Sequence, residues 1–101
     1  MDQQYTTFRE FYSFYLAEHR DPTCRRLHFA GSLAVLLTLG AAIATRRWWL
    51  LVLLPILGYG FAWVGHFFFE HNRPATFSYP LYSFLGDWVM FKDIITGRIP
   101  F

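Results

Sequence analysis

Charged residues are scarce in this chain of 101 residues: they make up 16% of the sequence, whereas hydrophobic residues make up 54% and aromatic residues 22%. A soluble domain of this size exposes too much of its surface to hide so much apolar material. Blocks of lysine and arginine are missing and the net charge is only +2, which excludes an electrostatic footprint for nucleic acid. These deficits favour a protein whose apolar surface faces a membrane.

Cysteine is nearly missing as well. Cys24 is the only one, which excludes an intrachain disulfide and predicts a metal site, if there is one, without cysteine ligands. The N-terminus lacks a basic start followed by a short apolar core, so we expect no cleavable signal peptide. Repeats, low-complexity tracts and long linkers are also missing, and we therefore predict a single domain over residues 1–101.

Two long runs are almost free of ionisable residues. Each is close to the roughly 20 residues that a helix needs to cross a bilayer, and we predict transmembrane helices over residues 22–45 and 48–70. Asp21 can cap the first helix, and Pro22 fits its first turn. The alternative is a buried hairpin in a soluble protein, but so short a chain offers too little protein to bury both helices.

Each end of the chain is predicted to form an amphipathic helix. In residues 3–19 aromatic side chains recur on one helical face, and His19 lies on the same face. Residues 80–96 carry an apolar stripe made of Leu81, Phe84, Leu85, Trp88, Phe91 and Ile95. Both helices suit a membrane interface. The predicted fold class is therefore an all-α integral membrane protein, in which a hairpin of two transmembrane helices is flanked by two interfacial helices.

The basic residues predict how the hairpin is oriented. Two spans place both termini on one side of the membrane, together with seven of the nine lysines and arginines; the other two, Arg46 and Arg47, form the turn. The positive-inside rule then puts the termini and the histidines on the cytoplasmic side, in the inner membrane of a bacterium or the endoplasmic reticulum of a eukaryote. Small residues let helices approach closely, so Gly58, Gly60 and Gly65 are the predicted surface for a homo-oligomer.

All four histidines fall at one predicted depth. His19 and His28 flank the start of the first span, and His66 and His71 lie at the end of the second. Ionisable residues at such a depth are functional candidates, and imidazole suits iron, zinc, copper and nickel. Since His71 is about 140° from His66 around an ideal helix, both can meet one metal only if the helix bends near Glu70. A metal site, a structural hydrogen-bond network and a proton relay or pH switch are the interpretations that the spacing leaves open.

Motifs at both ends of the chain resemble those of one family. They lie in FYSFYLAEHRDPTCRRLHFAGS and in HNRPATFSYPLYSFLGDWVMFKDIITGRI. The whole chain is similar to the family that contains the fungal 2-hydroxy-fatty-acid dioxygenase of phytosphingosine breakdown. The resemblance implies a membrane-embedded Fe(II) enzyme of α-oxidation. Such an enzyme uses O₂, without 2-oxoglutarate, to shorten a 2-hydroxy fatty acid by its carboxyl carbon. The iron ligands that it implies are His19, His28, His66 and His71.

Charged residues near the histidines are the candidate catalytic residues. On the dioxygenase hypothesis Arg73 or Arg25 pairs with the substrate carboxylate, which matches a guanidinium bidentately. Glu18, Glu70 and Asp87 are candidate acceptors for the N–H groups of the ligands. Arg73 can instead reach lipid headgroups, and Asp87 can be a charge on the helix surface.

Two other functions remain open. The spacing of His66 and His71 resembles a histidine box of the membrane di-iron hydroxylases and desaturases, although those enzymes draw on about twice as many histidines. The third interpretation is a small non-catalytic membrane scaffold or lipid-binding protein, in which all four histidines could be replaced with only a loss of stability.

Overall fold

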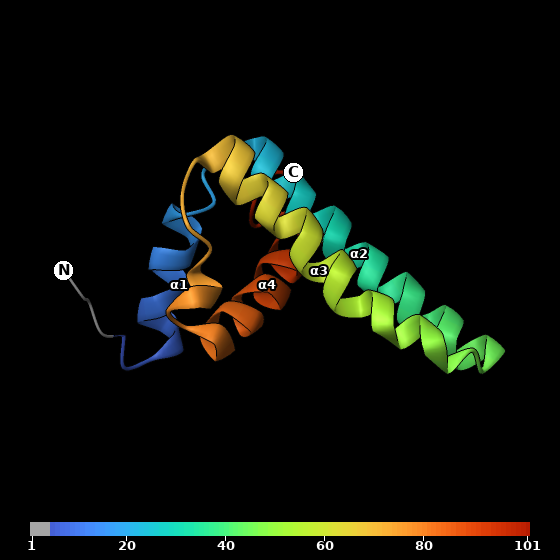
Figure 1. Ribbon diagram of the computed structural model, residues 1–101. Coiled ribbons are helices and arrows are strands. Elements are labelled where there is room, and N and C mark those ends of the chain that lie inside the picture. The colour runs from blue at the N-terminus through green and yellow to red at the C-terminus, as the bar shows by residue number, and fades with distance from the viewer. Residues whose placement is uncertain (1–4) are drawn as a thin grey trace.

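The computed structural model describes residues 5–101, and its regular elements over that range are all helical (Figure 1). This confirms the predicted all-α class. The elements in chain order are α1 (Phe8–Ala17), α2 (Pro22–Thr45), η1 (Trp48–Val52), α3 (Leu53–Val64), η2 (Gly65–Glu70), η3 (Ala75–Phe77) and α4 (Pro80–Ile95).

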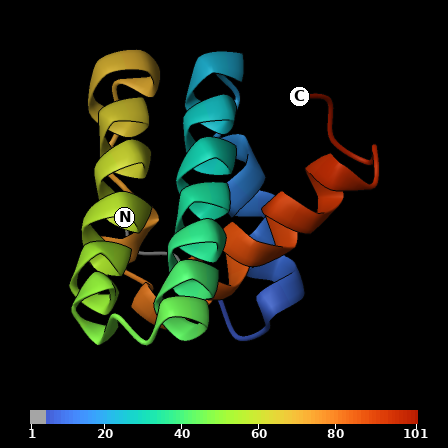
Figure 2. The same cartoon turned by 90° about the vertical axis from the view of Figure 1, so that its right-hand side faces the viewer.

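The longest part of the molecule is the antiparallel hairpin of α2 and α3, which lie side by side in Figure 2. Helix α2 begins where the sequence predicts, because the Asp21 side chain accepts hydrogen bonds from the backbone N–H groups of Thr23 (2.8 Å) and Cys24 (3.1 Å). It ends at Arg46, which has a left-handed backbone (φ 56°) and opens the turn. Helical structure then resumes as η1 and continues through α3 and η2.

Glycines let the two helices of the hairpin approach closely. A Cβ atom on Gly65 would lie 2.9 Å from Cys24 Sγ, and one on Gly58 would lie 3.5 Å from Val35 Cγ2. A Cβ atom on Gly60 would have no atom within 4 Å. Two of the three glycines predicted to contact another copy are therefore occupied by α2 of the same chain, and the three do not form one free surface.

Both arms of the hairpin are long and apolar enough to cross a membrane. They span 24 residues (Pro22–Thr45) and 23 residues (Trp48–Glu70), with mean hydropathies of 1.9 and 1.7. Only 17% of each apolar stretch is buried within the chain. The core helix of a soluble protein would be mostly covered, so the hairpin leaves most of its apolar surface to its surroundings.

Helices α1 and α4 pack against each other beside the histidine-bearing end of the hairpin (Figure 1). Phe11 and Tyr15 of α1 are fully buried against Met90 and Ile94 of α4, which confirms the predicted aromatic face. The predicted range 3–19 is longer than the helix observed, because Thr7 caps the N-terminus and Glu18 the C-terminus. Residues 3 and 4 of that prediction lie outside the described range.

Helix α4 turns most of its apolar stripe outward. Leu81, Phe84 and Ile95 are more than half exposed, whereas the inward face carries Ser83, Gly86, Met90, Asp93 and Ile94. Its polar members are hydrogen-bonded: the Asp93 Oδ2 atom accepts from the Tyr12 hydroxyl of α1 at 2.7 Å, and the Ser83 hydroxyl lies 3.0 Å from that of Thr76. Polar groups therefore hold α4 to the protein, while its apolar residues remain available to an apolar environment.

Candidate metal centre

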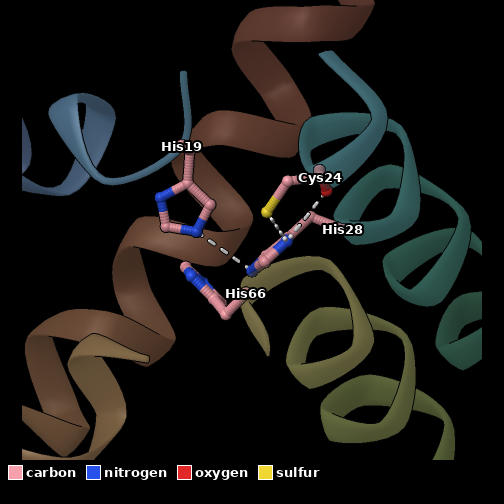
Figure 3. A group of neighbouring side chains, drawn as sticks. All are labelled: His19, Cys24, His28 and His66. Atoms are coloured by element: carbon pink, nitrogen blue, oxygen red, sulfur yellow. Dashed lines mark hydrogen bonds between the residues drawn. The ribbon is translucent and has the colours of Figure 1, made fainter. Parts of the chain in front are cut away.

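Three histidines from separate parts of the chain meet in the interior. His19 follows α1, His28 lies in the second turn of α2, and His66 lies in η2 (Figure 3). Their exposed fractions are 1%, 6% and 2%, and Cys24 beside them is fully buried. One ligand atom from each of these four side chains falls within 4.8 Å of all the others.

Hydrogen bonds fix which nitrogen of each imidazole carries the proton. Each Nδ1 lies beside an oxygen acceptor: Tyr15 O for His19 (2.6 Å), Cys24 O for His28 (3.2 Å) and Asn72 Oδ1 for His66 (2.6 Å). The Asn72 amide is oriented by its Nδ2, which donates to the Glu18 carbonyl at 3.1 Å. Since a carbonyl oxygen can only accept, all three Nδ1 atoms are donors. The three Nε2 atoms therefore present bare lone pairs.

The separation of these lone pairs fits a shared cation. His19 Nε2 and His28 Nε2 lie 3.1 Å apart, and with both Nδ1 atoms protonated there is no hydrogen to bridge them. Two nitrogens that are each about 2.1 Å from one ion lie about 3.0–3.4 Å apart when the angle at the ion is roughly 90–110°. The spacing of this pair, within a group of four possible ligand atoms, therefore fits a metal ion.

The environment of His19 favours the form that binds metal. Burial lowers the pKa of His19 well below its ordinary value, and the neighbouring His28 and His66 lower it further. The ring is therefore neutral at physiological pH, and its Nε2 lone pair is free to bind a metal.

Comparison with known proteins identifies the family. A family model described as 2-hydroxy-palmitic acid dioxygenase Mpo1-like matches residues 5–99. The chain belongs to this Mpo1-like family. No curated protein and no solved structure matched. The family match covers every helix and all four histidines, so the resemblance carried by the terminal motifs is confirmed.

In this Mpo1-like chain the fourth histidine lies apart from the other three. The chain does bend near Glu70, because η2 is a π-helix and His71 after it has a left-handed backbone (φ 60°), yet the bend does not bring His71 to the other histidines. The turn leaves the His71 side chain exposed. The backbone N–H of Asn72 then donates to His66 O at 3.0 Å.

The fourth donor in the group is a cysteine. Cys24 and His28 are four residues apart on α2 and face the same way. The sequence predicts a metal site without cysteine ligands, and the fold places Cys24 among the possible donors. The spacing of four residues ahead of a candidate ligand was the signal that could have revealed Cys24.

Among the candidate catalytic residues, Asp87 faces the cluster. Its carboxylate accepts a hydrogen bond from the Tyr15 hydroxyl, and its Oδ1 lies 3.9 Å from His28 Nε2. Burial raises the pKa of Asp87 to about 6. Glu70 instead accepts from the backbone N–H of Asp21.

Arg73 points away from the site. Its side chain is exposed, and its guanidinium lies 4.8 Å from the centre of the Phe77 ring.

One member of the cluster, His28, also lines an apolar pocket of about 460 Å³. His28 and Asp87 form one end of the pocket, and Ser32 lies one helical turn further along α2. The other lining residues are Val35, Leu39, Leu54, Pro55, Gly58, Tyr59, Phe84 and Trp88. This is the arrangement of a site that takes a molecule with a polar head and an apolar body.

Proposed function

We propose that this chain is a membrane-embedded, Fe(II)-dependent dioxygenase that removes one carbon from a 2-hydroxy fatty acid. The bond between C1 and C2 breaks, C1 leaves as CO₂, and C2 becomes the carboxyl carbon of the shorter acid. O₂ accepts the four electrons released, and water balances the atoms. The observation that carries the proposal is the gathering of three buried imidazoles, one of which, His28, also lines an apolar pocket.

His19, His28 and His66 would hold the iron through Nε2. Either Cys24 or His71 would supply a further ligand, and His71 would first have to move from its exposed position. When bound, the iron would supply electrons to O₂ and a positive charge for the substrate's oxygen atoms. The acceptors on the three Nδ1 atoms keep each ring in the tautomer that this binding needs.

Asp87 would accept a hydrogen bond from the substrate's 2-hydroxyl group. It lies at the polar end of the pocket, and the Tyr15 hydroxyl fixes its orientation. With a pKa of about 6, the carboxyl is mainly ionised at neutral pH and can accept a hydrogen bond. Tyr15 is fully buried, so water does not compete for its hydroxyl.

Arg25 is the better placed of the two arginines for the substrate carboxylate. Its Nη1 donates to the His19 carbonyl at 3.1 Å, and its Nε is buried with no hydrogen-bond partner within residues 5–101. A carboxylate would supply that partner and neutralise the charge. Glu70 would contribute indirectly, by fixing the start of the helix that carries Cys24 and His28. Arg73, which is exposed beside Phe77, would not contact the substrate.

The proposed enzyme is an integral membrane protein with its termini and histidines on the cytoplasmic side. The low burial of both spans and the outward apolar stripe of α4 support the membrane, and the distribution of lysine and arginine supports the cytoplasmic side. Helices α1 and α4 would lie at the interface. A fatty acid could then reach the pocket from the bilayer without crossing water.

Metal analysis and product analysis together test the proposal. The chain is purified in detergent without added metal, and its metals are measured by mass spectrometry beside a His28→Ala/His66→Ala variant. We expect near-stoichiometric iron that the variant loses. The iron-loaded protein should convert 2-hydroxypalmitic acid to pentadecanoic acid carrying oxygen from isotopically labelled O₂. A folded protein that binds no metal from mild, reducing preparations would instead support a scaffold.

A further inference from the structure

We infer that the apolar pocket holds the acyl chain of the substrate, and that its depth at Gly58 determines the longest chain that fits. This inference rests on the proposed function and adds to it a determinant of chain length. It concerns a part of the molecule that lies beyond the metal-binding side chains, between α2, α3 and α4.

The pocket has the polarity that an acyl chain requires. His28 and Asp87 lie close together in its lining, and the walls beyond them are apolar apart from the hydroxyls of Ser32 and Tyr59. Leu39 is the residue of α2 furthest from His28 in the lining, and the helix between them spans about 16 Å at 1.5 Å per residue. A chain whose head is held at the metal would therefore extend along the hairpin.

Phe84 and Trp88 of α4 line the same pocket, and Phe84 is 53% exposed. Its ring therefore lies both in the lining and on the outward apolar face of α4. The acyl tail can therefore enter from the bilayer past Phe84. The polar carboxyl end of the fatty acid then need not cross the apolar wall of the pocket.

Gly58 lies part-way along the pocket. Its missing side chain points towards Val35, which lies about two helical turns beyond His28. A Cβ atom there would lie 3.5 Å from Val35 Cγ2, an ordinary contact, so the backbone accommodates a side chain. Atoms beyond Cβ would project into the space between the helices. Leu54, nearer the turn, lines the deep end.

The enzyme would select chain length by steric overlap between the acyl chain and the pocket wall, and not by the free energy of burying apolar surface. Lipid tails are as apolar as the pocket, so a fatty acid that leaves the bilayer gains little from burial alone. A chain that is too long must bend or displace a helix. Pockets that discriminate on a single methylene typically achieve about 10–200-fold, and a leucine at Gly58 would obstruct several methylenes.

Three variants in lipid nanodiscs test the inference. Gly58→Leu should lower turnover of 2-hydroxypalmitic relative to 2-hydroxylauric acid by at least about tenfold. Leu54→Ala should shift the preference towards 2-hydroxystearic acid. Gly60→Leu is the matched control, because it adds the same side chain to the same helix where nothing lies within 4 Å, and it should keep the wild-type profile. If Gly58→Leu does not fold, Leu54→Ala still gives a result in the opposite direction.

A second measurement separates this inference from the proposed function. Metal-free protein is photolabelled with 2-hydroxypalmitic acid that carries a diazirine at its tail end, and the labelled residues are mapped by mass spectrometry. We expect labelling at Leu39 and Leu54 that unlabelled acid competes away, and that is lost in Gly58→Leu but kept in Gly60→Leu. Such labelling without turnover of any 2-hydroxy acid would support the acyl pocket and overturn the proposed function. Turnover with an unchanged chain-length profile in both pocket variants would overturn the pocket alone.

Discussion

The Nε2 atoms of His19 and His28 lie 3.1 Å apart, and neither can donate a hydrogen bond to the other. Two lone pairs at this distance repel each other inside a buried site. A cation between them converts that repulsion into attraction. Bringing these histidines together therefore lowers the stability of the metal-free protein, and metal binding restores that stability.

Metal binding is accordingly expected to stabilise the protein. A free metal concentration of a hundred times Kd adds about 2.7 kcal/mol to the free energy of unfolding. Thermal melting in detergent, after chelation and again after Fe(II) is restored under reducing conditions, measures the gain. The His28→Ala/His66→Ala variant should melt at the same temperature with and without metal. Equal melting temperatures for the chelated and restored wild type would contradict the assignment.

Cys24 and His71 should respond differently to replacement. Because His71 is exposed and Cys24 is fully buried beside the cluster, His71→Ala should retain more metal than His66→Ala. Cobalt-loaded wild type should show a thiolate-to-metal absorption band that Cys24→Ser lacks. A His71→Ala protein as poor in metal as His66→Ala would show instead that the segment after η2 closes onto the metal.

Asn72 should position His66 by two separate bonds. Its Oδ1 accepts from His66 Nδ1 at 2.6 Å, and its Nδ2 donates to the Glu18 carbonyl. Asn72→Ala removes both, and we expect a roughly 10–100-fold loss of metal affinity. Asn72→Asp keeps an acceptor for His66 and should recover much of that affinity, while the new charge beside Glu18 lowers stability. Metal titration measures the bond to His66, and thermal melting measures the bond to the Glu18 carbonyl. Equal metal affinities of Asn72→Ala and Asn72→Asp would contradict the role of Asn72 in positioning His66.

Gly65 should be intolerant of even one added carbon. A Cβ atom there would lie 2.9 Å from Cys24 Sγ and 3.1 Å from its Cα, so Gly65→Ala must separate the helices that carry His28 and His66. We expect metal content to fall and stability to drop by about 1–3 kcal/mol from overpacking. Gly60→Ala faces open space and should gain up to about 1 kcal/mol from helix propensity. Similar melting temperatures and metal contents for the two variants would rule out the tight contact.

The bond between Tyr12 and Asp93 should contribute to the attachment of α1. Burial and the neighbouring carboxylate of Asp93 raise the pKa of Tyr12, so the hydroxyl stays protonated and donates at 2.7 Å. Tyr12→Phe leaves a carboxylate that is only 7% exposed without that donor, at a cost of about 1–3 kcal/mol. Tyr82→Phe removes an exposed 3.4 Å bond to the Thr6 carbonyl and should cost much less. Chemical denaturation in one detergent compares them, and equal costs would count against the role of Asp93.

The helices were largely predictable because their boundaries have local causes. Asp21 and Pro22 fix the start of α2, and Pro80 lies at the start of α4, so the predicted and observed ranges agree closely at these points. The first helix was overextended because Thr7, which caps it, lies within a sequence that continues the amphipathic pattern. Local patterns determine helices well and their ends less well.

The site was only partly predictable, because it depends on how far the backbone turns. His19, His28 and His66 could be assigned to one end of the hairpin from topology alone. A π-helix and a left-handed residue decide where His71 points, and neither has a clear signature in the sequence. Cys24 is not among the predicted ligands, because a single cysteine gives no pairing signal and its position beside the histidines emerges only from the fold. The direction in which α4 faces also depends on its surroundings, which a hydrophobic stripe does not specify.

The outward stripe of α4 has a thermodynamic consequence. When a helix of a soluble protein detaches from its domain, water hydrates its apolar face and the heat capacity of the protein rises. Leu81, Phe84 and Ile95 are already exposed when α4 is in place, so in a bilayer or micelle detachment would change their surroundings very little. The chain should therefore unfold with a smaller heat-capacity change per residue than a soluble domain of its length, and its stability should vary with temperature along a flatter curve.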